Sequence, residues 1–131
     1  MYTRNGYDQY RNQSVLTAGP AELLIMLYDG CLRHLGQART AMQETNSLTA
    51  RQHLLKAQDI ITELINGLDF EYDIAHQLYS LYEYMGHELT IANVDQDPAC
   101  LDRIEPLLRD LRETWEQVSL SVQRMAIANV I

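Results

Sequence analysis

The stretch IEPLLRDLRETWEQVSLSVQRM, from Ile104 to Met125, decides the fold class of this chain. Its large apolar residues recur at alternating spacings of four and three positions, the 3.5-residue period of a helix packed along one seam in a bundle. Just before it, Asp97 and Pro98 supply a capping carboxylate and a proline suited to the first helical position. The stretch therefore predicts a long helix that buries one face. The seam consists of Ile104, Leu108, Leu111, Trp115, Val118, Val122 and Met125.

Three earlier segments predict helices of the same kind. The first begins at Pro20, and after a polar stretch Asn46 or Ser47 can cap the second. The second ends near Gly67 to Phe70, and a short loop from Asn93 to Gln96 follows the third. Four helices with short connections predict an all-α fold, an antiparallel up-down four-helix bundle. The faces expected to be buried are Leu24, Leu27, Tyr28, Cys31, Leu35, Ala38 and Met42 in the first helix, Leu54, Ala57, Ile61, Leu64, Ile65 and Leu68 in the second, and Ile74, Leu78, Leu81, Tyr82, Met85, Leu89 and Ala92 in the third.

The length of the chain predicts one domain over residues 1–131, with the bundle helices between residues 19 and 128. The first turns of the first helix, from Leu23 to Leu27, are apolar nearly all round, so a plain bundle face cannot cover them. The polar segment of residues 1–18, which contains Tyr7 and Tyr10, is the spare piece of chain long enough to do so. We therefore expect a mobile amino-terminal segment that packs on the bundle as a cap.

The third helix carries more apolar side chains than one buried stripe needs. Its core residues fill an arc of roughly 100°. Tyr79, Tyr84 and Ile91 fall outside that arc, on flanks where a helix in water normally carries charge. Tyrosine can line the rim of a core with its ring buried and its hydroxyl in water, or the surplus can form a surface kept for another chain. On this helix alone both interpretations stay open.

Charge and cysteine content argue against several functions. The formal net charge is −8, and only one of the ten basic residues, Lys56, is a lysine. Without a basic cluster, binding to nucleic acid or to anionic membranes is not expected. No apolar run is long enough to span a bilayer, so membrane insertion is not expected either. With no signal peptide in front, Cys31 and Cys100 are expected to be free, buried thiols of a cytosolic protein.

No residue pattern predicts catalysis or a cofactor. A di-iron bundle needs a glutamate three residues before its histidines, and His34, His53, His76 and His87 all lack one. Glu83 stands four residues before His87, a pair that is common on helix surfaces. There is no Cys-x-x-Cys pair and no glycine-rich phosphate loop. We expect no metal, no cofactor and no enzymatic activity, and a bundle enzyme or metal carrier is the more distant rival interpretation.

Blocks along most of the chain, taken in order, resemble one protein family. The first is TAGPAEL at residues 17–23, followed by MLYDG at 26–30. The second is KAQDIITEL at 56–64, and the third is LYEYM at 81–85. The last helix, with Trp115, is also similar in kind. The chain thereby resembles the flagellar export chaperones of the FliS type over nearly its whole length.

One stretch departs from that family pattern. Where many relatives have an Arg-Arg pair before the leucine of the third helix, this chain has Gly86-His87-Glu88. A contact that relies on the basic pair is therefore not carried over to this sequence.

The resemblance implies a non-enzymatic, ATP-independent secretion chaperone in the cytosol. Such a protein binds the disordered carboxy-terminal segment of flagellin, prevents premature polymerisation and delivers its client to the type III flagellar export apparatus. The client would lie over hydrophobic grooves as short helices and extended chain, and the ordering that this requires keeps the complex reversible. The candidate protein-binding residues are Tyr7, Tyr10, Ile60, Leu64, Tyr79, Tyr82, Tyr84 and Ile91, with Ile25, Leu32, Leu120 and Ile127 as weaker candidates.

Tyr7 and Tyr10 carry the sharpest of these hypotheses. In the family the amino-terminal segment folds over the body without client and is displaced on binding. Here a spacing of three places both rings on one side of a helical turn. The alternative is a frayed tail without function. For the chain as a whole, the closest rival is another helical adaptor, or a module that forms a homodimer in the absence of client.

Overall fold

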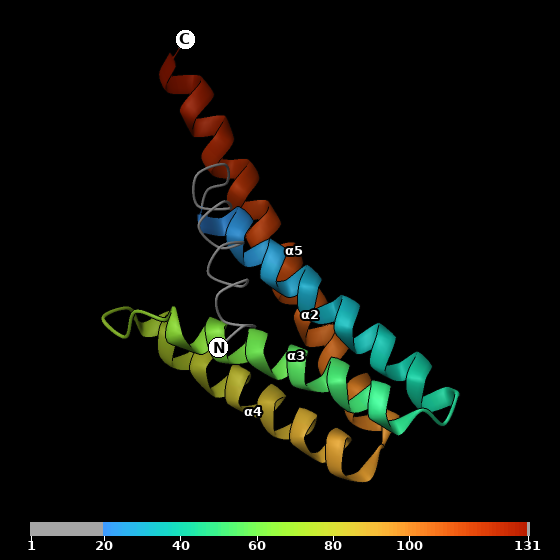
Figure 1. Ribbon diagram of the computed structural model, residues 1–131. Coiled ribbons are helices and arrows are strands. Elements are labelled where there is room, and N and C mark those ends of the chain that lie inside the picture. Colours follow the sequence, from blue (N-terminus) through green and yellow to red (C-terminus); the bar gives the residue numbers. More distant parts are fainter. Residues whose placement is uncertain (1–19, 131) are drawn as a thin grey trace.

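The computed structural model describes residues 20–130, with side chains described as far as Val122. In that part of the chain every regular element is a helix, which confirms the all-α prediction. The elements are α2 (Pro20–Gln43), α3 (Ser47–Asn66), α4 (Asp73–Asp95) and α5 (Pro98–Val130), shown in Figure 1. The expectations for Tyr7, Tyr10 and the amino-terminal cap, and for the side chain of Ile127, lie outside the described residues.

Local capping explains where the helices begin and end. The Asn46 side chain accepts a hydrogen bond from the Thr49 amide at 3.2 Å and starts α3. The Asp97 carboxylate accepts one from the Ala99 amide at 3.0 Å in the first turn of α5. The loop predicted from Asn93 is wrong at its start, because α4 continues to Asp95. Since Asn93 to Asp95 contain neither proline nor glycine, the helix ends only at Gln96, in a left-handed conformation with φ of 51°.

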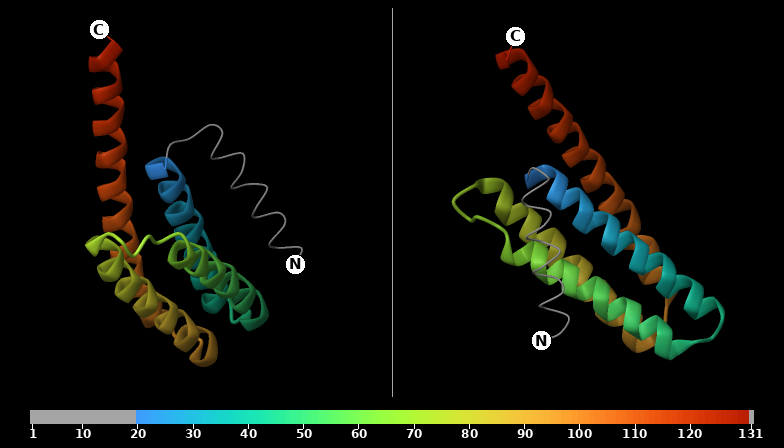
Figure 2. Two further views of the ribbon diagram at one scale, coloured as in Figure 1. Left: turned by 90° about the vertical axis from the view of Figure 1, so that its left-hand side faces the viewer. Right: turned by 45° about the horizontal axis from the view of Figure 1, so that its top comes forward.

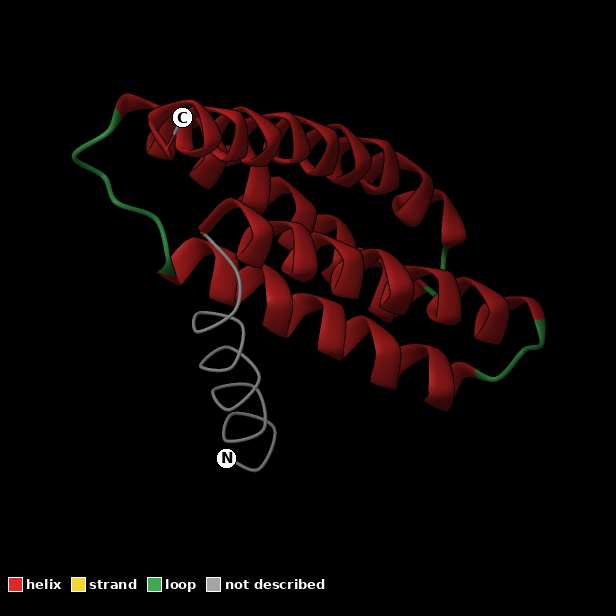
Figure 3. Cartoon of the chain, turned by 90° about the horizontal axis from the view of Figure 1, so that it is seen from above, coloured by secondary structure: helices red, strands yellow, loops and turns green. Residues whose placement is uncertain are grey.

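The helices form an antiparallel ring in which α2 packs against α3 and α5, and α4 packs against the same two neighbours. The turn between α2 and α3 and the turn between α4 and α5 lie at one end, which we call the closed end (Figure 3). The amino terminus of α2 and the longer link between α3 and α4 lie at the opposite end, which we call the open end. The up-down topology expected from the sequence is confirmed.

In α2, α3 and α4 the core follows the predicted faces, with two differences. Ile74 was expected inside but is exposed, since α4 buries Ala75 at that level instead. Ile60 was expected on the outside but is buried. It packs close to Gly30 of α2, where an added Cβ would lie 3.3 Å from the Ile60 Cδ1 atom, so the glycine admits the side chain. The core cluster comprises Leu27, Tyr28, Cys31, Leu35, Ala38, Leu54, Ala57, Ile60, Ile61, Leu64, Tyr82, Met85, Leu89, Ala92, Cys100, Leu101, Ile104 and Leu108.

Polar contacts set the register between α2 and α5. Arg39 binds Asp102 at 2.7 Å near the closed end, and Arg112 pairs with Asp29 further along. Near the open end the Ser119 hydroxyl bonds Glu22 at 3.3 Å. In this antiparallel register the first turn of α2 lies beside the residues just after Ser119. A helix of 33 residues is about 50 Å long, so α5 extends past the other three helices, as Figures 1 and 2 show.

The long extension of α5 explains where the predicted seam fails. Ile104 and Leu108 are fully buried, and Leu111 and Trp115 are partly buried. Val118 and Val122 are 38% and 58% exposed, although the sequence pattern placed them on the buried face. The pattern is regular throughout, but Val122 lies past the level of Pro20, where the described part of α2 begins. The buried seam is therefore shorter than the sequence predicts.

Candidate functional site

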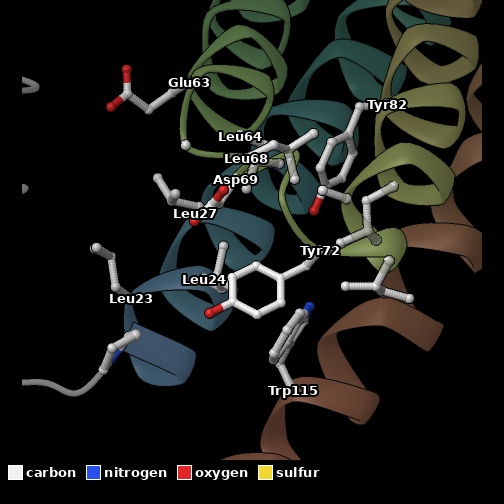
Figure 4. A pocket seen from close by; sticks show the side chains of 15 residues that line it. Leu23, Leu24, Leu27, Glu63, Leu64, Leu68, Asp69, Tyr72, Tyr82 and Trp115 are labelled. Carbon is white, nitrogen blue, oxygen red and sulfur yellow. The ribbon is translucent and has the colours of Figure 1, made fainter.

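An apolar groove opens at the open end of the bundle, with a volume of about 330 Å³. Elements from the whole chain meet there: the first turns of α2, the end of α3, the link to α4, the first half of α4, and the middle of α5 (Figure 4). We call it the end groove. It is lined by Pro20, Leu23, Leu24, Leu27, Glu63, Leu64, Gly67, Leu68, Asp69, Tyr72, Ile74, Ala75, Leu78, Tyr82 and Trp115.

The groove exists because the helices do not end level with one another. α3 stops at Asn66 and α4 begins at Asp73, so the link between them crosses the open end as irregular chain. α5 continues past both, and its Trp115 forms one wall. Figure 4 shows Leu24, Tyr72 and Trp115 directed toward one another across the groove. A concave, mainly apolar surface of this kind is what a binding site for an apolar segment requires.

Exposed apolar side chains continue from the groove onto the link and the start of α4. Tyr72 and Ile74 line the groove yet are 65% and 55% exposed. Phe70 is also exposed, and its ring contacts His76 at 5.2 Å and Tyr79 edge-on at 5.7 Å between centroids. Contiguous apolar surface beside a cavity marks an interaction site more often than scattered surface residues do.

A chain of aromatic hydrogen bonds lies at the inner side of the groove. The Trp115 indole N–H donates to the Tyr28 hydroxyl at 3.0 Å, and the Tyr28 and Tyr82 hydroxyl oxygens lie 2.6 Å apart. Tyr28 is 0% exposed and Tyr82 is 1% exposed. Burial raises the pKa of both hydroxyls, so both keep their protons near neutral pH. These bonds connect α2, α4 and α5.

Three of the residues chosen from the sequence as binding residues are buried. Leu64 and Tyr82 line the end groove with most of their surface covered. Ile60 lies in the core against α2 and is absent from the groove lining. Leu64 and Tyr82 had also been placed on the buried faces of their helices, so Ile60 is the one of the three whose burial differs from the sequence prediction. The burial of Tyr82 beside Met85 confirms the core face that we predicted for α4.

The remaining described candidates lie on α4. Tyr84 is 39% exposed. Tyr79 is half-buried, with its hydroxyl donating to Glu83 at 2.7 Å. Ile91 is half-buried and packs against the core, far along the helix from the groove. The structure thus brings together Leu64 and Tyr82 at the groove, places Tyr79 against Phe70 of the neighbouring link, and leaves Tyr84 and Ile91 apart. A binding role for each of them stays a prediction.

The stretch Gly86-His87-Glu88, which replaces the Arg-Arg pair of many relatives, contacts neighbouring helices in this structure. Glu88 is buried, and its carboxylate binds the Arg103 guanidinium of α5 at 2.9 Å. Gly86 lies near Ile61, where an added Cβ would be 3.9 Å from the Ile61 Cγ2 atom. The stretch therefore connects α4 to its two neighbours.

Sequence reasoning missed that the end groove exists. Leu24, Leu68 and Trp115 were taken as ordinary core residues, and Tyr72 was assigned no role. The available signal was the link itself, where Phe70 and Tyr72 place two large aromatic rings between helices, in a segment that is usually polar. The aromatic hydrogen bonds had no sequence signal, since their partners lie up to 87 positions apart.

The described histidines and cysteines lie outside the lining of the end groove. No cluster of three or more metal-ligating side chains forms among the residues that the structure describes. His34 and His53 share a hydrogen bond of 3.1 Å between their Nδ1 atoms, on the contact of α2 with α3. Cys31 and Cys100 are buried free thiols, as expected, and burial raises the pKa of Cys31 to about 12. A thiol that keeps its proton is a weak nucleophile.

Fold and groove together define a class: an all-α helical bundle with an apolar groove at one end. None of the described helices has the length and apolar character needed to cross a membrane. The comparisons with known proteins name the family within that class. The sequence profile of the family described as "Flagellar protein FliS" matches residues 3–122. The chain belongs to the FliS family.

Individual relatives agree with this assignment. The "Flagellar secretion chaperone FliS" of Bacillus subtilis is 34% identical over 124 residues, which cover 95% of this chain and 93% of the relative. The protein of the same name from Salmonella typhimurium is 36% identical, over 91% of this chain and 93% of its own length. The resemblance inferred from the sequence blocks is confirmed, and with it the expectation of a non-enzymatic protein, because these family members are secretion chaperones.

A solved structure supports the fold. The structure titled "Crystal structure of flagellar chaperone from bacteria" superposes with a TM-score of 0.73, covering 88% of this chain and 96% of that chain. Its sequence identity is 19%, so the likeness concerns the helical bundle.

Proposed function

We propose that this protein is a cytosolic flagellar secretion chaperone that binds the disordered carboxy-terminal segment of flagellin. It prevents premature polymerisation and presents the client to the type III export apparatus. The observation that carries the proposal is the end groove, an apolar cavity of about 330 Å³ in a member of the FliS family. The groove offers a client segment a place to bury apolar side chains that would otherwise drive assembly.

The exposed part of α5 extends the surface beyond the groove. Val118 and Val122, four positions apart on one face of the helix, are 38% and 58% exposed and follow Trp115 as a stripe, whereas Leu120, 40% exposed, lies on another face. A client helix that leaves the groove can pack its apolar face on this stripe. A disordered tail loses conformational entropy when it orders on both surfaces, which moderates the affinity and allows handover.

The amino-terminal segment is proposed to act as the gate of this surface. Tyr7 and Tyr10 lie only a short distance in sequence before Pro20, which lines the groove. Residues 1–18 can therefore cover the groove without client and leave it when client binds. Such a gate lowers the apparent affinity by the fraction of protein in the covered state.

The test is co-purification of the full chain with flagellin that retains or lacks its last segment of about forty residues, long enough to reach from the groove along α5. Retention of intact flagellin and loss of the truncated form are expected. Equal retention of both forms would contradict the assignment of the carboxy-terminal segment as ligand. In the same assay Tyr10→Ala should change the affinity while leaving the helical content unchanged, and unchanged affinity by calorimetry would rule out the gate.

A second candidate function is a homodimerising module, and the exposed stripe of Val118 and Val122 favours it. Two copies could cover this stripe by packing their α5 helices together. Size-exclusion chromatography with and without the flagellin tail separates the two functions. A dimer that ignores the tail would favour the module, and a monomer or dimer that the tail converts into a one-to-one complex favours the chaperone.

A further inference from the structure

Positive charge is missing from most of the chain that forms the end groove. Residues 20–32 of α2 contain no lysine and no arginine, and neither do residues 57–102, which include the second half of α3, the link and all of α4. Both ranges carry carboxylates, and those of Glu63 and Asp69 belong to the groove lining. Among the described residues that line the groove, none is basic. The groove is therefore an apolar cavity bordered by charge of one sign.

The link between α3 and α4 concentrates negative charge beside the groove. Asp69, Glu71 and Asp73 occupy alternate positions there, and all three are exposed. Asp73 lies in the first turn of α4, where the helix dipole favours a carboxylate. Within the part of the chain that the structure describes, Asp69 and Glu71 form no ion pair. Carboxylates this close in the chain repel one another, so a cation beside them would be stabilising.

An aromatic ring accompanies these carboxylates. Tyr72 follows Glu71 in the chain, lines the groove together with Asp69 and is 65% exposed (Figure 4). A guanidinium or ammonium group is attracted both to carboxylates and to the face of a tyrosine ring. The long stem of an arginine or lysine also packs on apolar surface while its charged end stays in water. This edge of the groove therefore suits a cationic side chain.

The volume of the groove limits what enters it. About 330 Å³ is at the small end of the range for ligand pockets, so the groove takes a few apolar side chains rather than a whole helix. The client residues on either side of them then lie at the rim, where Asp69 and Glu71 are. The charge of the rim favours basic residues at those positions and repels acidic ones.

We propose that the end groove takes an apolar stretch of the client that is bordered by a lysine or an arginine, with the cation held at Asp69 and Glu71 beside the Tyr72 ring. The inference rests on the proposed function, in which the client is the carboxy-terminal segment of flagellin. Burial of the apolar side chains supplies most of the affinity, and the cation sets the position at which the segment enters. Salt weakens the second contribution, because exposed charges are screened.

The test uses the full chain and a peptide of the carboxy-terminal segment of flagellin from the same organism. A segment without a lysine or arginine next to an apolar stretch would overturn the inference at once. The peptide, and a version with each lysine and arginine replaced by glutamine, are titrated by calorimetry at low ionic strength. Neutralising the peptide should weaken binding to the wild type about 3- to 10-fold, and added salt should reduce this difference.

Two double variants locate the effect. The rim variant, Asp69→Asn with Glu71→Gln, removes both charges and keeps the side-chain oxygen that accepts a hydrogen bond from the backbone amide of residue 71. It should bind the two peptides within about twofold of each other. The closed-end variant, Glu44→Gln with Asp95→Asn, changes the net charge equally at exposed positions. It should prefer the basic peptide as strongly as the wild type does.

Each result decides for or against the inference. Equal binding of the two peptides to the wild type would overturn it alone, and so would a rim variant that keeps the full preference for the basic peptide. Loss of the preference in the closed-end variant would assign the effect to net charge and overturn it as well. A wild-type chain that binds neither peptide would overturn the proposed function, and this inference with it.

Discussion

The closed end and the open end of the bundle are made by the same four described helices, yet one is filled and the other is hollow. At the closed end the side chains of Leu35, Leu54 and Leu101 are all fully buried. At the open end Tyr72 and Trp115 border a groove of about 330 Å³. Amphipathic helices fill a core only where all of them run side by side. Where they stop at different levels, part of their apolar faces stays uncovered and borders a groove.

The largest expected difference between the two ends concerns core truncation along α5. Leu101→Ala should lower the free energy of unfolding by about 2–5 kcal/mol, since it leaves a cavity in the filled end. Val122→Ala, on the same helix but past the open end, should change it by less than about 0.5 kcal/mol. Urea unfolding followed by circular dichroism measures both. Similar losses for the two variants would show that the end of α5 is packed in solution, and would remove the contrast.

Trp115 lies at the border between the two ends, so its truncation should lower the free energy of unfolding by an intermediate amount. A buried tryptophan truncated to alanine costs about 3–5 kcal/mol, and Trp115 is only partly buried, so we expect a value near the lower limit. Trp115→Phe keeps most of the ring but loses the hydrogen bond to Tyr28, and should cost about 1 kcal/mol. Thermal and urea unfolding check both values. A Trp115→Ala variant as stable as wild type would place this side chain outside the core.

The smallest effect is a pH dependence centred on α2 and α3. Burial, and then the nearby charges of Arg33, His53 and Lys56, lower the pKa of His34 from 6.5 to about 4. Above about pH 6.5 His34 is neutral in both states, and its contribution to stability is complete. Between pH 6.5 and 4 the unfolded chain takes up the proton first, so stability falls as the pH falls.

His34→Gln should flatten this part of the pH profile. Because His34 lies on the contact with His53 and is absent from the groove lining, the fluorescence of Trp115 in the folded state should not follow the same titration. Unfolding midpoints of wild type and variant across this pH range make the comparison. A variant whose profile keeps the full slope would assign the dependence to other groups.

The helices could be predicted from particular residues because their signals are local. Pro20, Asn46 and Asp97 each act within a turn of their own position, and the helix starts predicted from them agree with the structure. The seam period of α5 likewise predicted the burial of Ile104 and Leu108. The prediction failed at Val122 because the spacing of apolar residues in α5 carries no information about the length of the neighbouring helix α2.

The candidate site was less accessible to sequence reasoning. Tyr79 and Tyr84 could be singled out as surplus to the buried stripe, but their exposure depends on what surrounds them. Ile60 looked equally surplus and is buried, because Gly30 of another helix admits it. A contact such as that between Ile60 and Gly30 joins residues that are distant in the chain, so the local sequence pattern does not predict it.

By itself the sequence determined the helices, their amphipathic faces, the net negative charge and, through its motif blocks, the FliS family, since these depend on residue type and on spacing along one chain. Only the tertiary structure decided that the helices end at different levels, that Leu24, Tyr72 and Trp115 border one groove, and that Tyr28 and Tyr82 share a hydrogen bond beside it. The physical reason is that a cavity and its donors arise from contacts among separate elements, which no local pattern encodes.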